Sequence, residues 1–200
     1  MISIVLPTYL GKYPNAAKDR ELKLQRAIQS VIQQTFQDWQ LIVVCDGCEL
    51  SMRIVKQNYD KRIKGILIDK QPMFSGNVRN VGIDHAAGDW ICYLDNDDFF
   101  GSDHLELISR EMGNGYDWLF FNDYTLKKDK FTERTCYMKL GRCGTSNIAH
   151  KAVMKSRWDV KNRYGQDDWI FIQRLTGESP NWTKCEGQYL VCHIPRSFDI

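Results

Sequence analysis

The amino-acid sequence predicts an α/β fold with a mostly parallel central sheet and helices on both of its faces. Apolar runs of strand length alternate with segments of helical pattern through the first half of the chain. The runs are unbroken rather than alternating with polar residues, which is typical of strands buried on both faces. Each run also ends in polar or turn-forming residues, and open parallel sheets bind their ligands beyond these strand ends.

The first predicted elements are a strand, a loop and a helix. Residues 2–6 form a β-branched run that ends at Pro7, which predicts a buried strand. Glycine, proline and asparagine in the stretch 10–19 predict a loop. From Glu21 onwards, apolar residues recur at helical spacing, and this pattern predicts a helix to about Thr35.

Further strands and helices follow in alternation. Residues 41–44 and 63–68 predict two strands, and residues 76–87 predict a helix that ends at a glycine. A fourth strand is expected over residues 90–94. Ser102 and Asp103 then provide a cap for another helix.

The second half of the chain has a different pattern. Residues 118–121 predict a strand, and residues 124–137 predict a polar hairpin. A helix over 167–175 and a strand over 188–193 complete the expected elements. We therefore expect one domain over 1–200, with a lobe boundary near residue 100 and a smaller mixed or antiparallel region in the second half.

Composition and charge exclude several classes of protein. The 200 residues are 43% apolar, enough for a folded core, and their net charge is +2. Basic and acidic side chains are mixed, so we expect no nucleic-acid partner. Neither a signal-peptide pattern nor an apolar stretch approaching the roughly 20 residues of a membrane span is seen. We expect a cytoplasmic protein without a transmembrane segment.

The seven cysteines predict reduced thiols, because their number is odd and no secretory signal accompanies them. Cys45 and Cys48 form a C-x-x-C pattern. A zinc site would need a second closely spaced pair, and a redox pair usually begins a helix. We favour a packing role for this pair.

The sharpest chemical feature is the acidic turn, which we define as Asp95-Asn96-Asp97-Asp98. It directly follows the strand expected over 90–94, so three carboxylates meet at one strand end. Oxygen ligands of this kind suit Mg²⁺ or Mn²⁺, which bind one or two carboxylates together with substrate phosphates and water. Aspartate and asparagine also favour plain turns and helix caps, and the residues alone leave both interpretations open.

A set of stretches in a fixed order resembles the family-two glycosyltransferases of the GT-A fold. The set covers about half of the chain. Its members are residues 3–9, 27–35, 38–44, 46–47, 79–83 and 87–98. The resemblance implies a GT-A architecture in which residues 1–100 bind a nucleotide sugar and residues 101–200 bind the acceptor.

For binding of the donor base, the resemblance implies roles for residues at the ends of the first two predicted strands. Tyr9 matches a ring that packs on the base, beside Pro7 and Thr8. Asp46 matches the acid that accepts a hydrogen bond from the base or ribose. The sequence departs from the family nearby, with Cys45 before that aspartate, Cys48 after it, and Leu10 in place of a common asparagine.

On the diphosphate, the resemblance implies that Arg79 lies near the phosphates and that Asp97 is the principal metal ligand. Asp95 matches the first carboxylate of the metal motif and is expected to assist in both metal and donor binding. Asn96, between them, is expected in the nucleotide-sugar site. Mn²⁺ or Mg²⁺ is the implied cofactor.

The second half contains one match, an acidic pair that opens the helix expected at 167–175. The resemblance implies that Asp168 is the catalytic base. A favourable interaction of its carboxylate with the helix N-terminus is the alternative. His193 lies where some relatives place a histidine near the metal or the diphosphate; we favour a packed or surface role for it and for His150.

Together, the resemblance implies a metal-dependent, inverting glycosyltransferase of the hexosyl- or N-acetylhexosaminyl-transferring type. The expected partners are a nucleotide-diphosphate sugar, UDP-linked by preference, and a saccharide or lipid-linked acceptor hydroxyl. Peripheral association with the inner membrane surface stays open, as do the sugar and the oligomeric state. The alternatives are a non-catalytic nucleotide-sugar or carbohydrate-binding module and a nucleotidyltransferase. The latter would be expected to carry a glycine-rich, basic phosphate loop, which residues 6–9 do not form.

Overall fold

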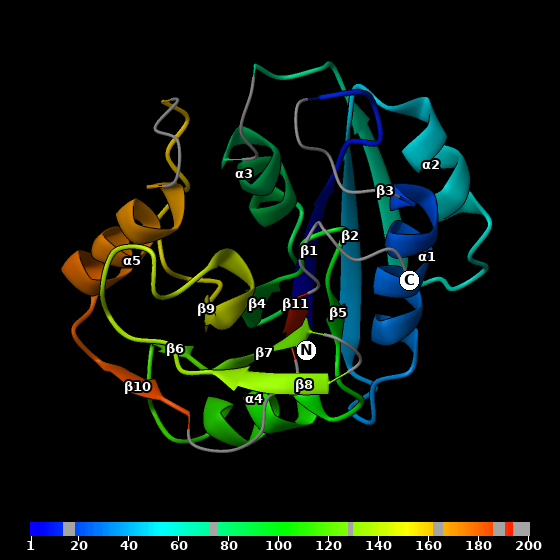
Figure 1. The fold of residues 1–200 in the computed structure, drawn as a ribbon. Coiled ribbons are helices and arrows are strands. Elements are labelled where there is room, and N and C mark those ends of the chain that lie inside the picture. Colours follow the sequence, from blue (N-terminus) through cyan, green and yellow to red (C-terminus); the bar gives the residue numbers. More distant parts are fainter. Residues whose placement is uncertain (14–18, 73–75, 128–129, 162–165, 186–190, 194–200) are drawn as a thin grey trace.

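A seven-stranded sheet forms the centre of the molecule, with helices on both faces (Figure 1). The computed structural model describes residues 1–13, 19–72, 76–127, 130–161, 166–185 and 191–193. The central strands are β1 (Ile2–Thr8), β2 (Trp39–Asp46), β3 (Ile63–Ile68), β4 (Trp90–Tyr93), β6 (Trp118–Phe120), β9 (Ile148–Lys151) and β10 (Trp182–Lys184). In space they run in the order β10-β6-β9-β4-β1-β2-β3.

Neighbouring strands in this sheet are parallel except at β9, which is antiparallel to both β4 and β6. This confirms the predicted α/β class with a mostly parallel sheet. Parallel register aligns the strands so that β1, β2, β3 and β4 end at one edge. The predicted convergence of these strand ends is therefore present.

The helices divide between the two faces of the sheet. They are α1 (Arg20–Ile32), α2 (Glu49–Lys56), α3 (Gly76–Asp84), α4 (His104–Met112) and α5 (Asp167–Glu178), with a short 3₁₀ helix η1 (Thr145–Asn147). Apolar residues of α1, α2 and α4 pack in one cluster with Ile4 and Leu6 of β1. Residues of α3 and α5 pack on the opposite face, with Val5 and Tyr93.

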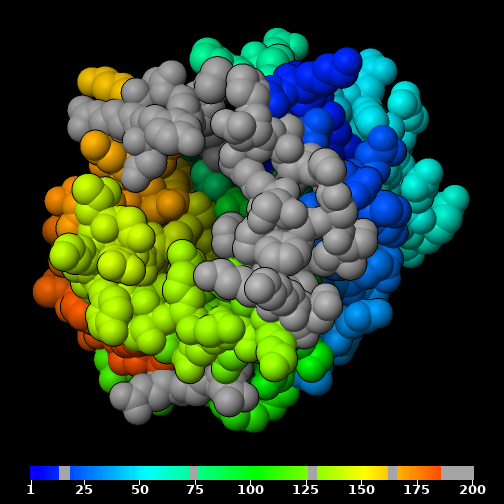
Figure 2. All heavy atoms as spheres, in the orientation of Figure 1, coloured from blue at the N-terminus to red at the C-terminus, as the bar shows by residue number. Residues whose placement is uncertain are grey.

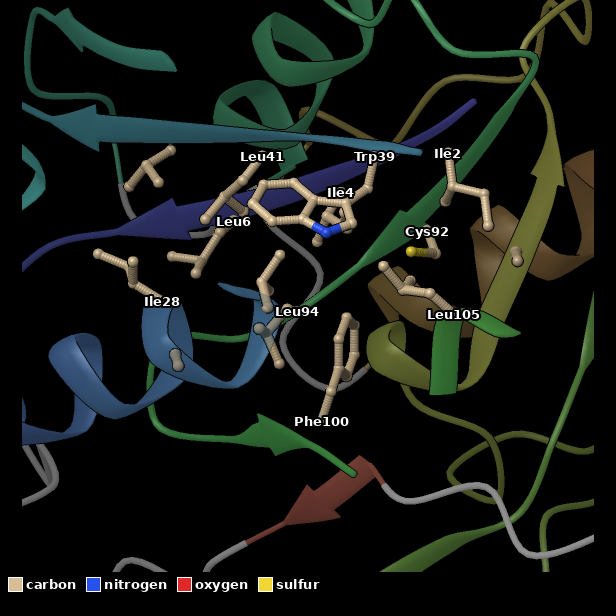
Figure 3. Packing of buried hydrophobic residues seen from close by; sticks show 14 of the residues in the cluster. Ile2, Ile4, Leu6, Ile28, Trp39, Leu41, Cys92, Leu94, Phe100 and Leu105 are labelled. Atoms are coloured by element: carbon tan, nitrogen blue, oxygen red, sulfur yellow. The ribbon is translucent and has the colours of Figure 1, made fainter. Parts of the chain in front are cut away.

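The burial of β1 explains why its apolar run is continuous. Ile4, Val5 and Leu6 are all fully buried, although successive side chains point to opposite faces. Figure 3 shows Ile4 and Leu6 packed with Ile28 of α1 on one of these faces. Each such side chain stabilises the fold by about 1.5–3 kcal/mol relative to an exposed one.

A smaller sheet lies in the second half of the chain, in the order β5-β11-β7-β8. Its strands are β5 (Phe99–Phe100), β7 (Asp123–Lys127), β8 (Lys130–Arg134) and β11 (Val191–His193). β7 and β8 are antiparallel, with Leu126 opposite Phe131, which confirms the predicted hairpin. The pair formed by β11 and β7 is parallel, so this sheet is mixed.

Several elements differ from the expectation. The strand predicted at 63–68 is β3, whereas the helix predicted over 76–87 ends at Asp84. Asp103 occupies the N-cap position of α4, but it makes no side-chain capping bond, so the predicted cap is wrong in its chemistry. The short elements α2, β5, β9 and β10 were not predicted.

Helix α3 lies close to β1 because a glycine faces the strand. A Cβ atom at Gly82 would lie 2.3 Å from Cγ1 of Val5, far inside van der Waals contact. The glycine therefore sets how closely this helix approaches the sheet. In the described part of the chain, no helix is both long enough and apolar enough to cross a membrane.

Candidate functional site

The acidic turn follows β4 at the sheet edge where β1 also ends. Nδ2 of Asn96 donates a hydrogen bond of 3.0 Å to Oγ1 of Thr8. This bond joins the turn to the end of β1 across 88 residues of sequence. Both residues were predicted for the nucleotide-sugar site, and the fold brings them into contact.

The end of β2 carries Asp46, whose carboxylate is nearly buried. Nζ of Lys70 donates to its Oδ2 atom at 2.7 Å, and the backbone N–H of Gln71 donates to its Oδ1 atom at 2.6 Å. The same ammonium nitrogen lies 4.5 Å from the centroid of the Tyr9 ring. Tyr9 and Asp46, which the sequence predicts at the donor base, are thus held together by a lysine that sequence reasoning missed.

Arg79 projects from α3 toward the acidic turn. Its guanidinium donates a hydrogen bond of 2.8 Å to Oδ1 of Asp95 and lies 4.7 Å from the centroid of the Trp158 ring. Arg79 is 6% exposed, so most of this cation is shielded from water. A buried guanidinium at the turn offsets the repulsion among its carboxylates.

Asp97 and Asp98 complete the turn. The backbone carbonyl of Asp97 accepts a hydrogen bond of 2.7 Å from Arg26, which fixes the turn against α1. Asp98 is buried, whereas Asp95 and Asp97 are only partly buried. The two carboxylates that the sequence predicts as metal ligands are therefore the more accessible ones.

The donor set of the turn fits a hard cation that takes part of its coordination from substrate. No group of three or more histidine, cysteine or acidic side chains able to hold a metal lies within the described ranges. Mg²⁺ and Mn²⁺ sites built on one or two carboxylates complete their shell with phosphate and water oxygens. Asp97 and Asp95 suit such a site, and they do not form an all-protein cage.

Asp168 lies in the first turn of α5 and is partly buried. Burial raises the pKa of its carboxyl above the ordinary value of 3.8, and the Arg79 charge and a hydrogen bond from Thr145 partly offset that rise. The Thr145 hydroxyl donates this bond to Oδ1 at 2.5 Å. A partly buried carboxylate of raised pKa is suited to accept a proton.

The 3₁₀ helix η1 connects this carboxylate to the acidic turn. Oγ of Ser146 accepts a hydrogen bond of 3.3 Å from the backbone N–H of Asp95, while the preceding Thr145 holds Asp168. Asp95 also raises the pKa of Asp168 through charge repulsion. The acidic turn and the predicted base therefore belong to one site. Figure 2 shows a hollow in this face, with green atoms at its bottom.

Asp167, the first acid of the pair, has a buried Oδ1 atom for which the described residues provide no hydrogen-bond partner. Burial and the charge of Asp168 raise the pKa of the Asp167 carboxyl.

His150 is fully buried, and its Nε2 atom lies 2.8 Å from the hydroxyl of Tyr93. Burial lowers the pKa of His150 to about 4, so this histidine is a neutral core residue, as predicted.

Roles for two cysteines and a histidine were predicted from the sequence: Cys45, Cys48 and His193. Cys45 and Cys48 are buried free thiols, and burial raises the pKa of Cys45 to about 12, which agrees with a packing role. Cys48 occupies the N-cap position of α2, a helix that the sequence did not predict. The side chain of His193 lies outside the described residues.

An open cavity of about 780 Å³ lies at the same sheet edge, between the ends of β2 and β3 and the start of α3. Gly47, Lys70, Gln71 and Asn77 contribute to its lining. The cavity adjoins the Asp46–Lys70 pair but is not lined by the acidic turn or Asp168. The cavity thus lies on the β3 side of this edge, and a single cleft that includes the acidic turn stays a prediction.

Residues 3–167 match the family described as Glycosyl transferase family 2. The chain belongs to this family. Family membership and the fold confirm the resemblance seen in the sequence. The roles of the individual site residues stay predictions.

Two curated relatives are named as glucosyltransferases. The GalNAc(5)-diNAcBac-PP-undecaprenol beta-1,3-glucosyltransferase of Campylobacter jejuni is 30% identical over 124 residues, or 60% of this chain and 37% of the relative. The UDP-Glc:alpha-D-GlcNAc-diphosphoundecaprenol beta-1,3-glucosyltransferase WfgD of Escherichia coli is 29% identical over 124 residues, or 61% of this chain and 45% of the relative. The chain therefore spans less than half of either relative.

Solved structures show the same fold at low sequence identity. S. aureus TarS 1-349 in complex with UDP-GlcNAc matches 99% of this chain and 59% of its own, with a TM-score of 0.74 and 14% identity. The mannosyltransferase PcManGT from Pyrobaculum calidifontis, in complex with GDP-Man and Mn²⁺, matches 96% of this chain and 56% of its own. Its TM-score is 0.65 at 10% identity. These likenesses confirm the GT-A fold.

Proposed function

We propose that this chain is the donor-binding and catalytic part of an inverting glycosyltransferase that transfers a sugar from a UDP-sugar to an acceptor hydroxyl. One observation carries the proposal. The partly buried Asp168 carboxylate and the acidic turn are joined through Thr145 and Ser146, so a proton acceptor and a diphosphate-binding turn would share one site. Family membership supports the same conclusion.

In the proposed reaction, Asp168 accepts the proton of the acceptor hydroxyl as its oxygen attacks the anomeric carbon. The attack comes from the face opposite the leaving diphosphate, so a single displacement inverts the configuration at that carbon. General-base assistance of this kind contributes about 10²–10⁴ in rate. The hydrogen bond from Thr145 orients the carboxylate, because it fixes Oδ1 and leaves Oδ2 for the hydroxyl.

Arg79 and, through a bound cation, the acidic turn would neutralise the charge on the leaving diphosphate. Arg79 lies against Asp95, where its guanidinium offers donors to phosphate oxygens. Asp97, with help from Asp95, would hold Mn²⁺ or Mg²⁺. When bound, such an ion supplies neutralisation of the negative charge that develops on the diphosphate. Thr8 and Asn96 position the turn that presents these carboxylates.

The names of the relatives indicate which classes of donor and acceptor to propose for this chain. The two curated relatives are named as glucosyltransferases acting on undecaprenol-linked saccharides, and the TarS structure contains UDP-GlcNAc. We therefore propose a UDP-hexose or UDP-N-acetylhexosamine donor and a lipid-linked saccharide acceptor. An acceptor of this type would place the protein at the inner membrane surface as a peripheral enzyme.

Slow hydrolysis of the donor provides the test, because it needs no knowledge of the acceptor. The chain is incubated with a panel of UDP-sugars and Mn²⁺, and release of UDP is measured. We expect release from one donor, and we expect Asp168→Asn to abolish it while calorimetry still shows UDP binding. Binding without any release from the wild-type chain would identify a nucleotide-sugar-binding module and refute the catalytic assignment.

A further inference from the structure

Lys70 contacts both residues that the resemblance places at the donor base, Tyr9 and Asp46. It follows β3, and its ammonium nitrogen has three neighbours within the described structure. These are Oδ2 of Asp46 at 2.7 Å, the backbone carbonyl of Gln71 at 2.7 Å, and the Tyr9 ring, whose centroid lies 4.5 Å away. Two of its three N–H donors are thus held by oxygen acceptors, and the third has only the ring face.

We propose that Lys70 selects a uracil base over cytosine by donating its third hydrogen bond to a carbonyl oxygen of the base. This inference rests on the proposed function, because it concerns the donor of the same site. It adds a specificity-determining residue that neither the family resemblance nor the relatives assign.

The pattern of hydrogen-bonding groups supports uracil. Asp46 presents carboxylate acceptors, and it is flanked by the Lys70 ammonium on one oxygen and the Gln71 N–H on the other. Each carboxylate oxygen can accept a further hydrogen bond. The backbone N–H of Gln71 is already taken by Asp46, so the site presents one remaining donor, on Lys70, beside a carboxylate acceptor. Uracil presents the complement, a carbonyl oxygen beside an N–H.

Cytosine does not match this pattern. It carries an amino group and an unprotonated ring nitrogen where uracil carries a carbonyl and an N–H, so its amino group would face the ammonium. Sites that hydrogen-bond a specific group reject analogues without it, because buried polar groups are then left unpaired.

The backbone at Gly47 lies very close to Lys70. Gly47 has a φ of 61°, a region that favours glycine, and its N–H donates to the carbonyl of Ile68 at 2.9 Å. A Cβ atom at this position would lie 2.5 Å from Cβ of Lys70. Gln71 also binds Asn77 at the start of α3, at 2.7 Å. The lysine is therefore held from both sides, and its side chain is 41% exposed toward the open cavity.

The test is calorimetric titration of the whole chain with UDP and with CDP in saturating Mn²⁺. We expect the wild-type protein to prefer UDP, and Lys70→Met to reduce the ratio of the two affinities by about tenfold to a hundredfold, the value of one charge-assisted hydrogen bond. Lys70→Arg keeps a cation and should retain most of the preference. Lys64→Met, at an exposed lysine within β3, the strand that Lys70 follows, is the matched control and should change nothing.

Lys70→Met leaves the Asp46 carboxylate without its cation, so circular dichroism must first show that the variant is folded. Lys70→Gln, which keeps an N–H donor without the charge, provides a second measurement and should give an intermediate ratio. An unchanged ratio in a folded variant, or a wild-type chain that binds UDP and CDP equally, would overturn the proposal. Donor release and its dependence on Asp168 are measured separately, so failure of base selection and failure of catalysis give different results.

Discussion

The Thr145 hydroxyl donates a 2.5 Å hydrogen bond to Oδ1 of Asp168, and the next residue, Ser146, accepts one from the backbone of Asp95. Two consecutive residues thus connect the proposed base to the acidic turn. A displacement of η1 would move both groups at once. The geometry of the site is therefore set by this short segment as much as by the acidic residues themselves.

Replacement of Asp168 by asparagine should abolish transfer and leave donor binding nearly intact. We expect a loss of at least about 10² in the rate of donor turnover, since the proton acceptor is removed. Rates of UDP release and the affinity for UDP in Mn²⁺ are the two measurements. Asp167→Asn, at the neighbouring acid, is the matched control. Turnover at the wild-type rate in the Asp168 variant would remove this residue from the mechanism.

The same replacement should not weaken the fold at neutral pH. Burial raises the pKa of Asp168 in the folded state. Its contribution to stability is therefore fully present below the unfolded-state pKa near 3.8 and is lost as the pH rises through the folded-state value. Because asparagine stays neutral, we expect Asp168→Asn to have a melting temperature at pH 7 equal to or above that of the wild type. A marked decrease would contradict the inferred sign of the pKa shift.

Thr145→Ala should move the acid limb of the pH–activity profile to higher pH. The mechanism needs the ionised carboxylate, so activity falls as the pH falls through the pKa of Asp168. The Thr145 bond lowers that pKa, and its loss should raise the pKa further. The ratio kcat/KM for donor turnover, measured across acidic pH, is the readout. Thr145→Ser keeps the hydroxyl and should restore the wild-type profile, whereas superimposable profiles for all three proteins would refute the effect.

Asp97→Ala should weaken donor binding only where a divalent cation contributes to it. Calorimetry with UDP is performed with Mn²⁺ and with a chelator. We expect wild-type affinity to increase with Mn²⁺ and the variant to lose most of that increase. Asp38→Ala is the control, because this exposed carboxylate precedes β2 at the opposite edge of the sheet. An Mn²⁺ dependence that survives in the Asp97 variant would contradict the assignment of this ligand.

Two glycine replacements should have opposite effects on stability. Gly82→Ala places a Cβ atom 2.3 Å from Val5 and should destabilise the protein by about 1–3 kcal/mol, because the contact between α3 and β1 is already tight. Gly177→Ala, in α5, meets nothing within 4 Å and should stabilise it by about 0.5–1 kcal/mol. Denaturant unfolding gives both values. Equal effects at the two positions would show that helical preference, rather than packing, controls them.

The residues of the site that could be predicted are those at the carboxyl ends of the parallel strands. Thr8, Asp46 and the acidic turn each follow an unbroken apolar run, and parallel pairing places such ends together. Lys70 escaped prediction because a lysine after a strand has the pattern of a surface residue. Only the folded chain brings its ammonium to an aspartate 24 residues away.

The second half was harder to predict because its strands are short. β9 and β10 span four and three residues, too few for a clear periodicity, and their positions depend on pairing with β6 and β4. Thr145 carries no local signal either, since its partner lies 23 residues further along the chain. The acidic pair at α5 was predictable by resemblance, but its connection to the turn through η1 was not.

The antiparallel strand β9 also determines whether the chain can be cut into two separate fragments. It is the one described strand of the second half that pairs with a central strand of the first, with Cys92 opposite Ala149. A fragment ending before β9 would therefore expose the edge of β4, and unpaired sheet edges promote aggregation. The proposed donor recognition and proton abstraction are best dissected by point substitution in the intact chain, because cutting between the halves opens the sheet that carries both groups of residues.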